Sequence, residues 1–220
     1  MKCQPSTIGK RLIEWWFKNS RSYPWRETSD PYGIVIAEIM LQRTRADQVV
    51  PVYLEFLETF PTIVDLEKAS ENEIGSFFNR LGLFWRARLT KKMADFVAEE
   101  HDGIFPRNRL GLLRIPAIGE YISNAILSFA YDQPAVIVDS NVCRIIMRLH
   151  GLEISGEARR NRKIREIADK MLPPRQKSRF LNLAFIDFGA LICKPAKPHC
   201  LKCPTNSSCD YYHSKEEATP

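Results

Sequence analysis

Four cysteines stand close together near the end of the chain: Cys193, Cys200, Cys203 and Cys209 form a Cys-x6-Cys-x2-Cys-x5-Cys pattern. The segments between them are too short to enclose a core, so we expect four thiolates around one inorganic centre. Both a tetrahedral zinc ion and a [4Fe–4S] cluster use such ligands. Two local disulfides are disfavoured, because the N-terminal residues lack the apolar stretch of a secretion signal and disulfides are rare inside cells. The spacing predicts a metal site but does not identify the metal.

The charge balance favours a polyanionic partner. The chain has 220 residues with 32 Lys and Arg against 26 Asp and Glu, a formal net charge of +6. This modest excess supports nucleic-acid binding without proving it. No apolar run approaches the roughly 18 residues that a membrane-spanning helix needs. We therefore expect a cytoplasmic monomer without membrane contact, associated with the nucleoid if its source is a prokaryote.

Apolar residues recur at helical spacing along most of the chain, which predicts an all-α fold. Asp30 and Pro31 have the form of an N-cap and first turn for a helix reaching Arg43, and Ser70 to Glu73 has the form of a capping box. Residues 136–138 are the only strand-like piece, and residues 213–220 form a polar tail that we expect to be frayed. Further helices are predicted at about 8–18, 46–59, 86–100, 120–131, 140–150, 157–171 and 177–192.

Residues 107–131 predict a helical hairpin whose tight turn, Ile115-Pro116-Ala117-Ile118-Gly119, leads into a helix from Glu120. The N–H groups at such a helix start bind phosphate without reading base sequence, although similar turns occur in ordinary hairpins. Farther along, Asp139 is placed to cap the helix at 140–150. A carboxylate fixed and kept ionised at a helix N-terminus is also suited to stabilise positive charge on a sugar.

Several ordered segments together resemble the helix-hairpin-helix DNA glycosylase superfamily, in the iron–sulfur branch that contains endonuclease III, the MutY adenine glycosylases and the MIG-type thymine glycosylases. The resemblance extends over about residues 15–212 and is strongest to the MIG type. It is carried by the hairpin, the cysteines, Tyr23-Pro24-Trp25-Arg26, Asp30-Pro31-Tyr32, Glu38-Ile39-Met40-Leu41-Gln42-Arg43-Thr44, Leu81-Gly82-Leu83 and Val138-Asp139-Ser140-Asn141-Val142.

The resemblance implies a two-lobed fold: a six-helix barrel at 28–137 that contains the hairpin, and a cluster domain made of residues 1–27 and 138–212, with a DNA-binding cleft between them. It implies a [4Fe–4S] cluster rather than zinc, in a structural or redox role. The implied partner is double-stranded DNA containing a mismatched or damaged base. The chain departs from the family at Ala117, where the hairpin usually has glycine, so the phosphate contact could be reshaped.

The family's functional positions carry over residue by residue. Glu38 matches a catalytic glutamate that activates water or protonates the base; partial burial among apolar neighbours would raise its pKa. Asp139 matches the carboxylate that stabilises the sugar cation, and Tyr121 would contact the base or sugar. Without the family match, Gln42 would read as a solvent-facing helix end and Leu83 as a packed leucine. The implied DNA contacts are Gln42, Arg43, Leu83, Ile118, Gly119 and Glu120.

Tyr121 decides between reaction types. Strand-cleaving relatives carry a lysine there, whose amine forms a Schiff base, which a phenol cannot do. MutY enzymes usually have serine at this position, whereas the MIG type has tyrosine. The sequence therefore predicts a monofunctional glycosylase that flips out thymine or uracil opposite guanine in base excision repair, with weak or absent lyase activity. One alternative is an adenine glycosylase acting on A·G or A·8-oxoG; another is a non-catalytic, cluster-bearing DNA-binding protein.

Overall fold

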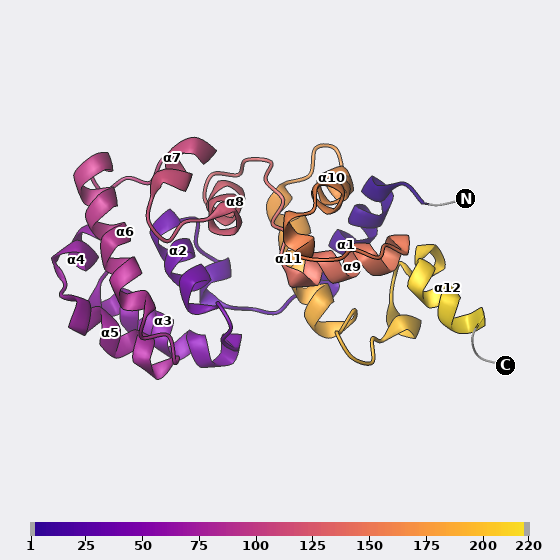
Figure 1. The fold of residues 1–220 in the computed structure, drawn as a ribbon, viewed down its shortest axis with the longest axis horizontal. Coiled ribbons are helices and arrows are strands. Elements are labelled where there is room, and N and C mark those ends of the chain that lie inside the picture. The colour runs from indigo at the N-terminus through magenta and orange to yellow at the C-terminus, as the bar shows by residue number, and fades with distance from the viewer. Residues whose placement is uncertain (1–2, 218–220) are drawn as a thin grey trace. The chain divides into compact units, whose positions relative to one another are not determined.

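The protein is described by a computed structural model that covers the backbone of residues 3–217 and the side chains of residues 3–214. Every regular element in this part of the chain is a helix, which confirms the all-α prediction (Figure 1). The chain divides into two compact units, residues 22–131 and residues 1–21 with 132–220. The predicted divisions lay six residues later at both points, before residues 28 and 138.

The unit at 22–131 begins with a short 3-10 helix and continues through seven α-helices, one more than the six predicted. The additional short helix, α4, is explained by a reciprocal cap in which Thr62 Oγ1 accepts from the Asp65 backbone and the Asp65 side chain accepts from the Thr62 backbone. The elements are η1 (Pro24–Arg26), α2 (Pro31–Met40), α3 (Ala46–Thr59), α4 (Ile63–Lys68), α5 (Glu71–Arg80), α6 (Arg86–His101), α7 (Arg109–Arg114) and α8 (Glu120–Phe129).

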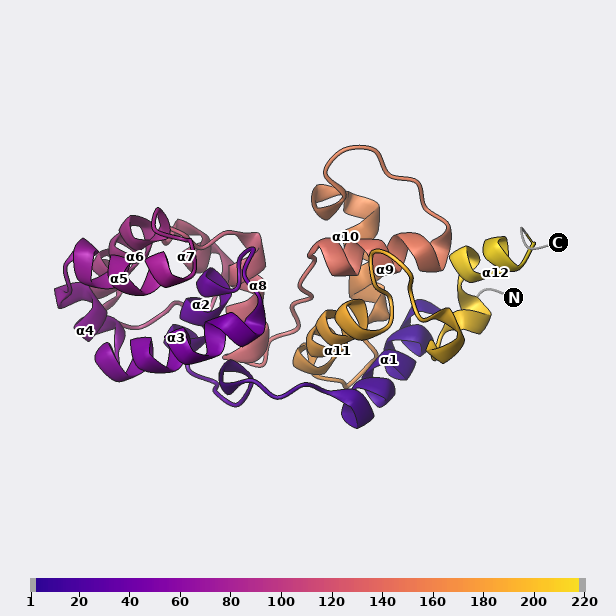
Figure 2. The same cartoon turned by 90° about the horizontal axis from the view of Figure 1, so that it is seen from below.

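Helix α2 forms the centre of this unit. All its residues from Tyr32 to Met40 are buried, and it packs against α3 and α8 (Figures 1 and 2). Asp30 caps it as predicted, with its carboxylate accepting from Tyr32 N at 3.1 Å and Gly33 N at 3.2 Å. The helix ends before Arg43, which adopts a positive φ of 64° that an α-helix cannot contain.

The unit starts earlier than predicted because two aromatic side chains tie its first residues to α3. Tyr23 stacks on Trp25 with ring centroids 5.0 Å apart, and Trp25 meets Tyr53 edge-on at 5.4 Å. These contacts bury Trp25. Residues 22–27 therefore belong with α3 rather than with the N-terminal helix.

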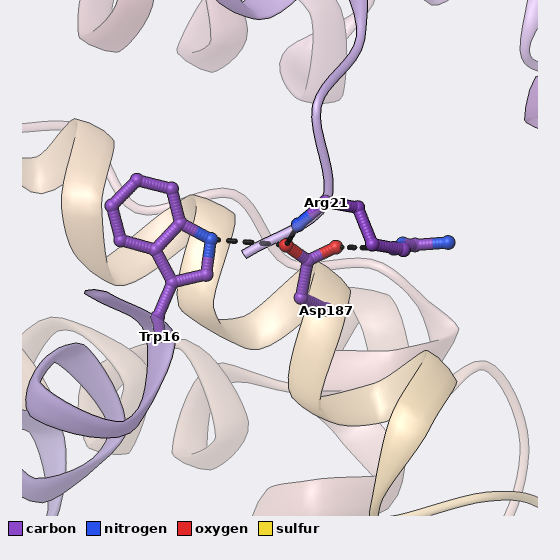
Figure 3. A network of polar contacts seen from close by, with 3 residues as sticks. All are labelled: Trp16, Arg21 and Asp187. Carbon is purple, nitrogen blue, oxygen red and sulfur yellow. Dashed lines mark hydrogen bonds and ion pairs between the residues drawn. The ribbon is translucent and has the colours of Figure 1, made fainter. Parts of the chain in front are cut away.

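The second unit joins the N-terminal helix to the C-terminal part of the chain. Helix α1 lies beside α11, although most of the sequence separates them (Figure 2). Figure 3 shows the polar link: the buried Asp187 on α11 accepts from Trp16 Nε1 at 3.0 Å and from Arg21 Nε at 2.7 Å. The helices are α1 (Pro5–Asn19), α9 (Ser140–His150), η2 (Ala158–Arg160), α10 (Arg162–Met171), α11 (Ser178–Leu191), η3 (Cys200–Lys202), η4 (Asn206–Ser208) and α12 (Asp210–Glu217).

The strand-like prediction at 136–138 is wrong. Residues 134–139 belong to no helix or strand, and side chains of α11 take up backbone hydrogen bonds of this segment. Ser178 Oγ accepts from Ala135 N at 3.3 Å, and Asn182 Oδ1 accepts from Ile137 N at 2.9 Å, while Asn182 Nδ2 donates to Ala135 O at 2.8 Å. These bonds also explain why the segment belongs to this unit.

Two predicted helix boundaries also change here. The predicted helix at 157–171 is divided into η2 and α10, because Asn161 caps the start of α10 with its side chain. Residues 213–217 of the predicted polar tail are the last residues of α12, which continues to Glu217, and residues 218–220 lie outside the described residues. Among the described residues, no helix is long and apolar enough to cross a bilayer.

Candidate active site

Glu38 is a buried acid on α2. Glu38 is only 7% exposed, and Ile34, one helical turn earlier, is 2% exposed. The burial expected from its apolar neighbours is thus confirmed. The helix that carries Glu38 packs against α8, which carries the half-buried Tyr121 in its first turn. Two of the three predicted catalytic residues therefore come from adjoining helices of one unit.

The hairpin turn between α7 and α8 has the predicted form, with one unusual residue. Ala117 adopts φ 66°, the left-handed region that favours glycine, which explains the family's glycine at this place. Gly119, by contrast, has an ordinary φ of −93°, and a Cβ built on it would meet no atom within 4 Å. The chain itself therefore does not require glycine at 119.

The predicted phosphate contacts around this turn differ in exposure. Ile118 is buried, so only its backbone is available, while Gly119 and Glu120 are exposed. Gly119 is the N-cap of α8 and has no side chain to cap it. A phosphate at this helix start would therefore meet backbone N–H groups, as expected for contacts that do not read sequence.

Asp139 belongs to the other unit, where it caps α9. Its Oδ1 accepts from Val142 N at 2.8 Å and its Oδ2 accepts from Asn141 Nδ2 at 2.8 Å. The predicted N-cap is confirmed. The carboxylate is partly exposed and held by two donors at a helix N-terminus. Its role in stabilising the sugar cation stays a prediction.

Gln42 makes a polar contact with Arg86 that the sequence did not suggest. The guanidinium of Arg86, the first residue of α6, donates from Nη2 to Gln42 Oε1 and lies over the Trp85 ring at 4.1 Å. Burial lowers the pKa of Arg86, and the nearby positive charge of Arg43 lowers it further. The sequence analysis did not single out Arg86 or Trp85. The run Phe84-Trp85-Arg86, two large aromatic residues followed by an arginine, was the feature that could have pointed to them.

Leu83, the predicted wedge residue, is 5% exposed and packed in the unit. Its neighbours are different: Phe84 is 69% exposed and Trp85 is 48% exposed. Phe84 and Trp85 are thus two large exposed aromatic side chains at the turn before α6, of the kind on which bases stack. Leu83 remains a predicted wedge, and any insertion by it would require it to leave its packed position.

The four clustered cysteines line one small cavity, together with Arg148, Tyr211 and other residues. All four are free thiols. Arg148 Nη1 lies 3.4 Å from Cys193 Sγ, and Thr205 Oγ1 lies 3.2 Å from Cys203 Sγ. Burial raises the pKa of the Cys209 thiol to about 11. Among residues 3–214 no three His, Cys, Asp or Glu side chains are close enough to bind a single metal ion.

Comparisons with known proteins agree with this fold. Residues 36–183 match the profile of the HhH-GPD superfamily of base excision DNA repair proteins. The chain is 35% identical to the thymine/uracil-DNA glycosylase of Methanothermobacter thermautotrophicus over 91% of each chain. It is 33% identical to the adenine DNA glycosylase of Buchnera aphidicola subsp. Baizongia pistaciae over 91% of this chain and 57% of that protein.

The fold also matches the solved structure of a thermostable thymine-DNA glycosylase. The TM-score is 0.90 at 34% sequence identity, covering 96% of this chain and 97% of that one. The chain belongs to the HhH-GPD superfamily of base excision DNA repair proteins, as its motifs indicated.

Proposed function

We propose that this chain is a monofunctional DNA glycosylase that removes thymine or uracil opposite guanine. The observation that carries the proposal is the 35% identity to a thymine/uracil-DNA glycosylase over 91% of both chains. Tyr121 supports the monofunctional part, because a phenol cannot form the Schiff base through which lysine-bearing relatives cut the strand. The net charge of +6 fits duplex DNA as the partner. We further propose that the protein acts as a monomer in the cytoplasm.

DNA would dock through its backbone. Phosphates near the target bind the N-terminus of α8, where Gly119 leaves room for close approach. The target nucleotide is rotated out of the stack, and the gap it leaves is filled from the protein. Gln42 and the exposed side chains of Phe84 and Trp85 are available beside that gap. This docking reads the duplex by shape and charge and leaves base recognition to the side chains.

The chemistry would be hydrolysis of the N-glycosidic bond. As the bond lengthens, its electron pair leaves on the base, and positive charge develops at C1′ of the deoxyribose. Asp139, fixed by its two donors, stabilises that charge. Water then forms the new C1′–O bond and passes its proton to Glu38, a buried carboxylate suited to act as a base. Tyr121 contacts the base or sugar.

We further propose that the four cysteines hold a [4Fe–4S] cluster. The donor set fits: four free thiols line one cavity, Arg148 Nη1 donates to Cys193 Sγ, and Thr205 Oγ1 lies within hydrogen-bond distance of Cys203 Sγ. When bound, the cluster would cross-link residues 193–209 and supply a redox-active centre. Protein purified without oxygen should be yellow-brown and contain iron and acid-labile sulfide. Colourless protein with zinc would reject the cluster.

Base release from four duplexes tests the function. With G·T, G·U, A·G and A·8-oxoG substrates, we expect thymine and uracil to be released and the abasic strand to stay uncut until alkali is added. The 33% identity to an adenine DNA glycosylase makes adenine release the second candidate. Adenine release without thymine or uracil release would overturn our choice. DNA binding with no release from any duplex would indicate the non-catalytic alternative.

A further inference from the structure

The net positive charge of the chain is concentrated in one segment. Residues 156–179 contain nine of the 32 Lys and Arg but only three of the 26 Asp and Glu. This segment alone therefore carries a formal charge of +6, and the remaining 23 basic and 23 acidic residues cancel. We call residues 156–179 the basic segment. A polyanion that is attracted by the charge of this protein is attracted mainly to it.

The basic segment displays its charge at the surface. It runs through η2 and α10 into the first turn of α11. In its first half, the residues Arg159, Arg160, Arg162 and Lys163 are all exposed. Glu157 pairs with Arg159 at 2.9 Å and with Arg160 at 3.1 Å, so one carboxylate faces two guanidinium groups. Exposed ion pairs of this kind are weak, and a phosphate can therefore compete with Glu157 for both arginines.

Two of these cations stand where a helix favours acids. Arg162 and Lys163 are the first two residues of α10, whose first turn contains no Asp or Glu. Because a helix N-terminus carries partial positive charge, cations at this position lower the stability of the helix. Asn161 already caps α10 by accepting from Lys163 N at 2.9 Å and from Ile164 N at 3.3 Å. The two charges are thus not needed for the local fold, and such departures from local stability rules are expected at functional surfaces.

The basic segment borders the helix that Asp139 caps. Arg159 lines the same cavity as Ser140 and Cys143, which belong to the first turn of α9. Burial and the charge of Asp139 raise the pKa of the Cys143 thiol, whereas the charge of Arg159 lowers it. Arg159 and Asp139 therefore lie within electrostatic reach of the same thiol. Arg165 Nε donates to Arg159 O at 3.1 Å and so ties η2 to α10, which keeps the basic segment beside α9.

We propose that the basic segment is a second DNA-binding surface, which holds backbone phosphates close to the nucleotide whose sugar faces Asp139. The inference rests on the proposed function, because it takes duplex DNA as the polyanion and places Asp139 at the sugar. The partner fits, because the chain belongs to a superfamily of DNA repair proteins and the fork of an arginine matches two phosphate oxygens. Unlike the hairpin, this surface binds through side chains, and it adds affinity for any base sequence.

The test compares two double variants that have the same net charge. Arg160→Gln with Lys163→Gln removes two exposed cations of the basic segment, and Lys10→Gln with Lys68→Gln removes two exposed cations from α1 and α4. Affinity for a duplex with a tetrahydrofuran abasic analogue opposite guanine is measured from low to high salt. Since each phosphate contact contributes about 0.9 to the slope of log affinity against log salt, we expect the first variant to lower this slope by about 1–2 and to bind about tenfold more weakly at low salt. The control should keep the slope, and equal slopes in the two variants would overturn the inference.

Uncharged phosphates test for direct contact. Methylphosphonate linkages are placed one at a time along both strands of the same duplex, so that each duplex lacks a single backbone charge. Where the basic segment contacts a phosphate, removing its charge should weaken binding by the unsubstituted protein but not by the variant Arg160→Gln with Lys163→Gln. Such non-additive losses identify a pair of groups in contact. Additive losses at every linkage would contradict the proposal.

Two further measurements separate the inference from a folding artefact and from the proposed function. Arg160→Lys with Lys163→Arg keeps both charges and should keep the slope, and thermal unfolding of each variant checks the fold. Release of thymine and uracil is measured in parallel. If no duplex releases either base, the proposed function fails, yet a lowered salt slope in the first variant would still support DNA binding by the basic segment. Base release together with an unchanged slope would support the function and overturn the inference.

Discussion

The carbonyl oxygen of Met171 fills the place where a side chain on Gly9 would begin: a Cβ there would lie 1.7 Å from it. This contact sets how closely α1 and α10 approach. We expect Gly9→Ala to lower the free energy of unfolding by about 3 kcal/mol or more, since backbone cannot yield to the clash. Gly75→Ala is the matched control: its Cβ would meet Ala87 at an ordinary 3.7 Å, so helix α5 should gain stability. Chemical denaturation measures both, and equal effects would contradict the packing argument.

Asp187 is fully buried and accepts hydrogen bonds from Trp16 and from the backbone and side chain of Arg21. Replacing it with asparagine turns an amino group toward a donor and leaves Arg21 without its ion-pair partner. We expect Asp187→Asn to lower the free energy of unfolding by about 3 kcal/mol. Glu14→Gln, an exposed acid on the same helix as Trp16, should change it by less than about 0.5 kcal/mol. Comparable losses in the two variants would show that burial of the carboxylate is unimportant.

The hairpin offers two opposite substitutions. Ala117→Gly relieves a left-handed backbone at φ 66° and should raise the free energy of unfolding by about 0.5–1 kcal/mol, after the entropy cost of glycine is subtracted. Gly119→Ala should leave stability unchanged or slightly higher, because the new Cβ meets nothing within 4 Å. It should nevertheless weaken duplex binding by obstructing phosphate. Retained affinity in Gly119→Ala would remove the hairpin from the DNA interface.

Asp139→Asn separates capping from catalysis. Asparagine caps helices about as well as aspartate, so α9 should keep its first turn with a cost below about 1 kcal/mol. The charge, however, is lost. We expect base release to fall by about a hundredfold or more while duplex affinity is kept. Single-turnover rates and binding isotherms on the same preparation measure the two effects. Full activity in Asp139→Asn would exclude this carboxylate from the reaction.

Tyr121→Lys should add a new chemistry. An amine in the first turn of α8 could attack C1′ of the sugar as the base leaves with the electron pair of the glycosidic bond; opening of the C1′–O4′ bond then gives an imine, which borohydride reduces to a stable protein–DNA adduct. We expect strand nicking and a trapped adduct in this variant, with neither in the unsubstituted protein. Glu120→Lys, which places the amine one position earlier on an exposed side chain, is the control. Trapping by neither would mean that residue 121 does not face the sugar, and trapping by both would mean that the position of residue 121 is not special.

Local chemistry explains what could be predicted from the sequence. The caps at Asp30 and Asp139 and the capping box at Ser70 join groups two or three residues apart, so their pattern is complete in the sequence. The helices follow from apolar spacing in the same way. The family motifs named the catalytic candidates and the hairpin because those motifs are short and contiguous.

Tertiary structure decided what depends on distant partners. Residues 136–138 looked like a strand, but Asn182 of α11 takes up the backbone bonds that a neighbouring strand would have used. Leu83 looked available for insertion, yet it is packed while Phe84 is exposed. Gln42 and Arg86 are 44 positions apart, and no periodicity relates them. The sequence by itself therefore determined most of the helices, several of their caps and the chemical groups, although it did not predict α4 or the division between η2 and α10. Only folding decided which of those groups are paired, because that depends on what the rest of the chain brings beside them.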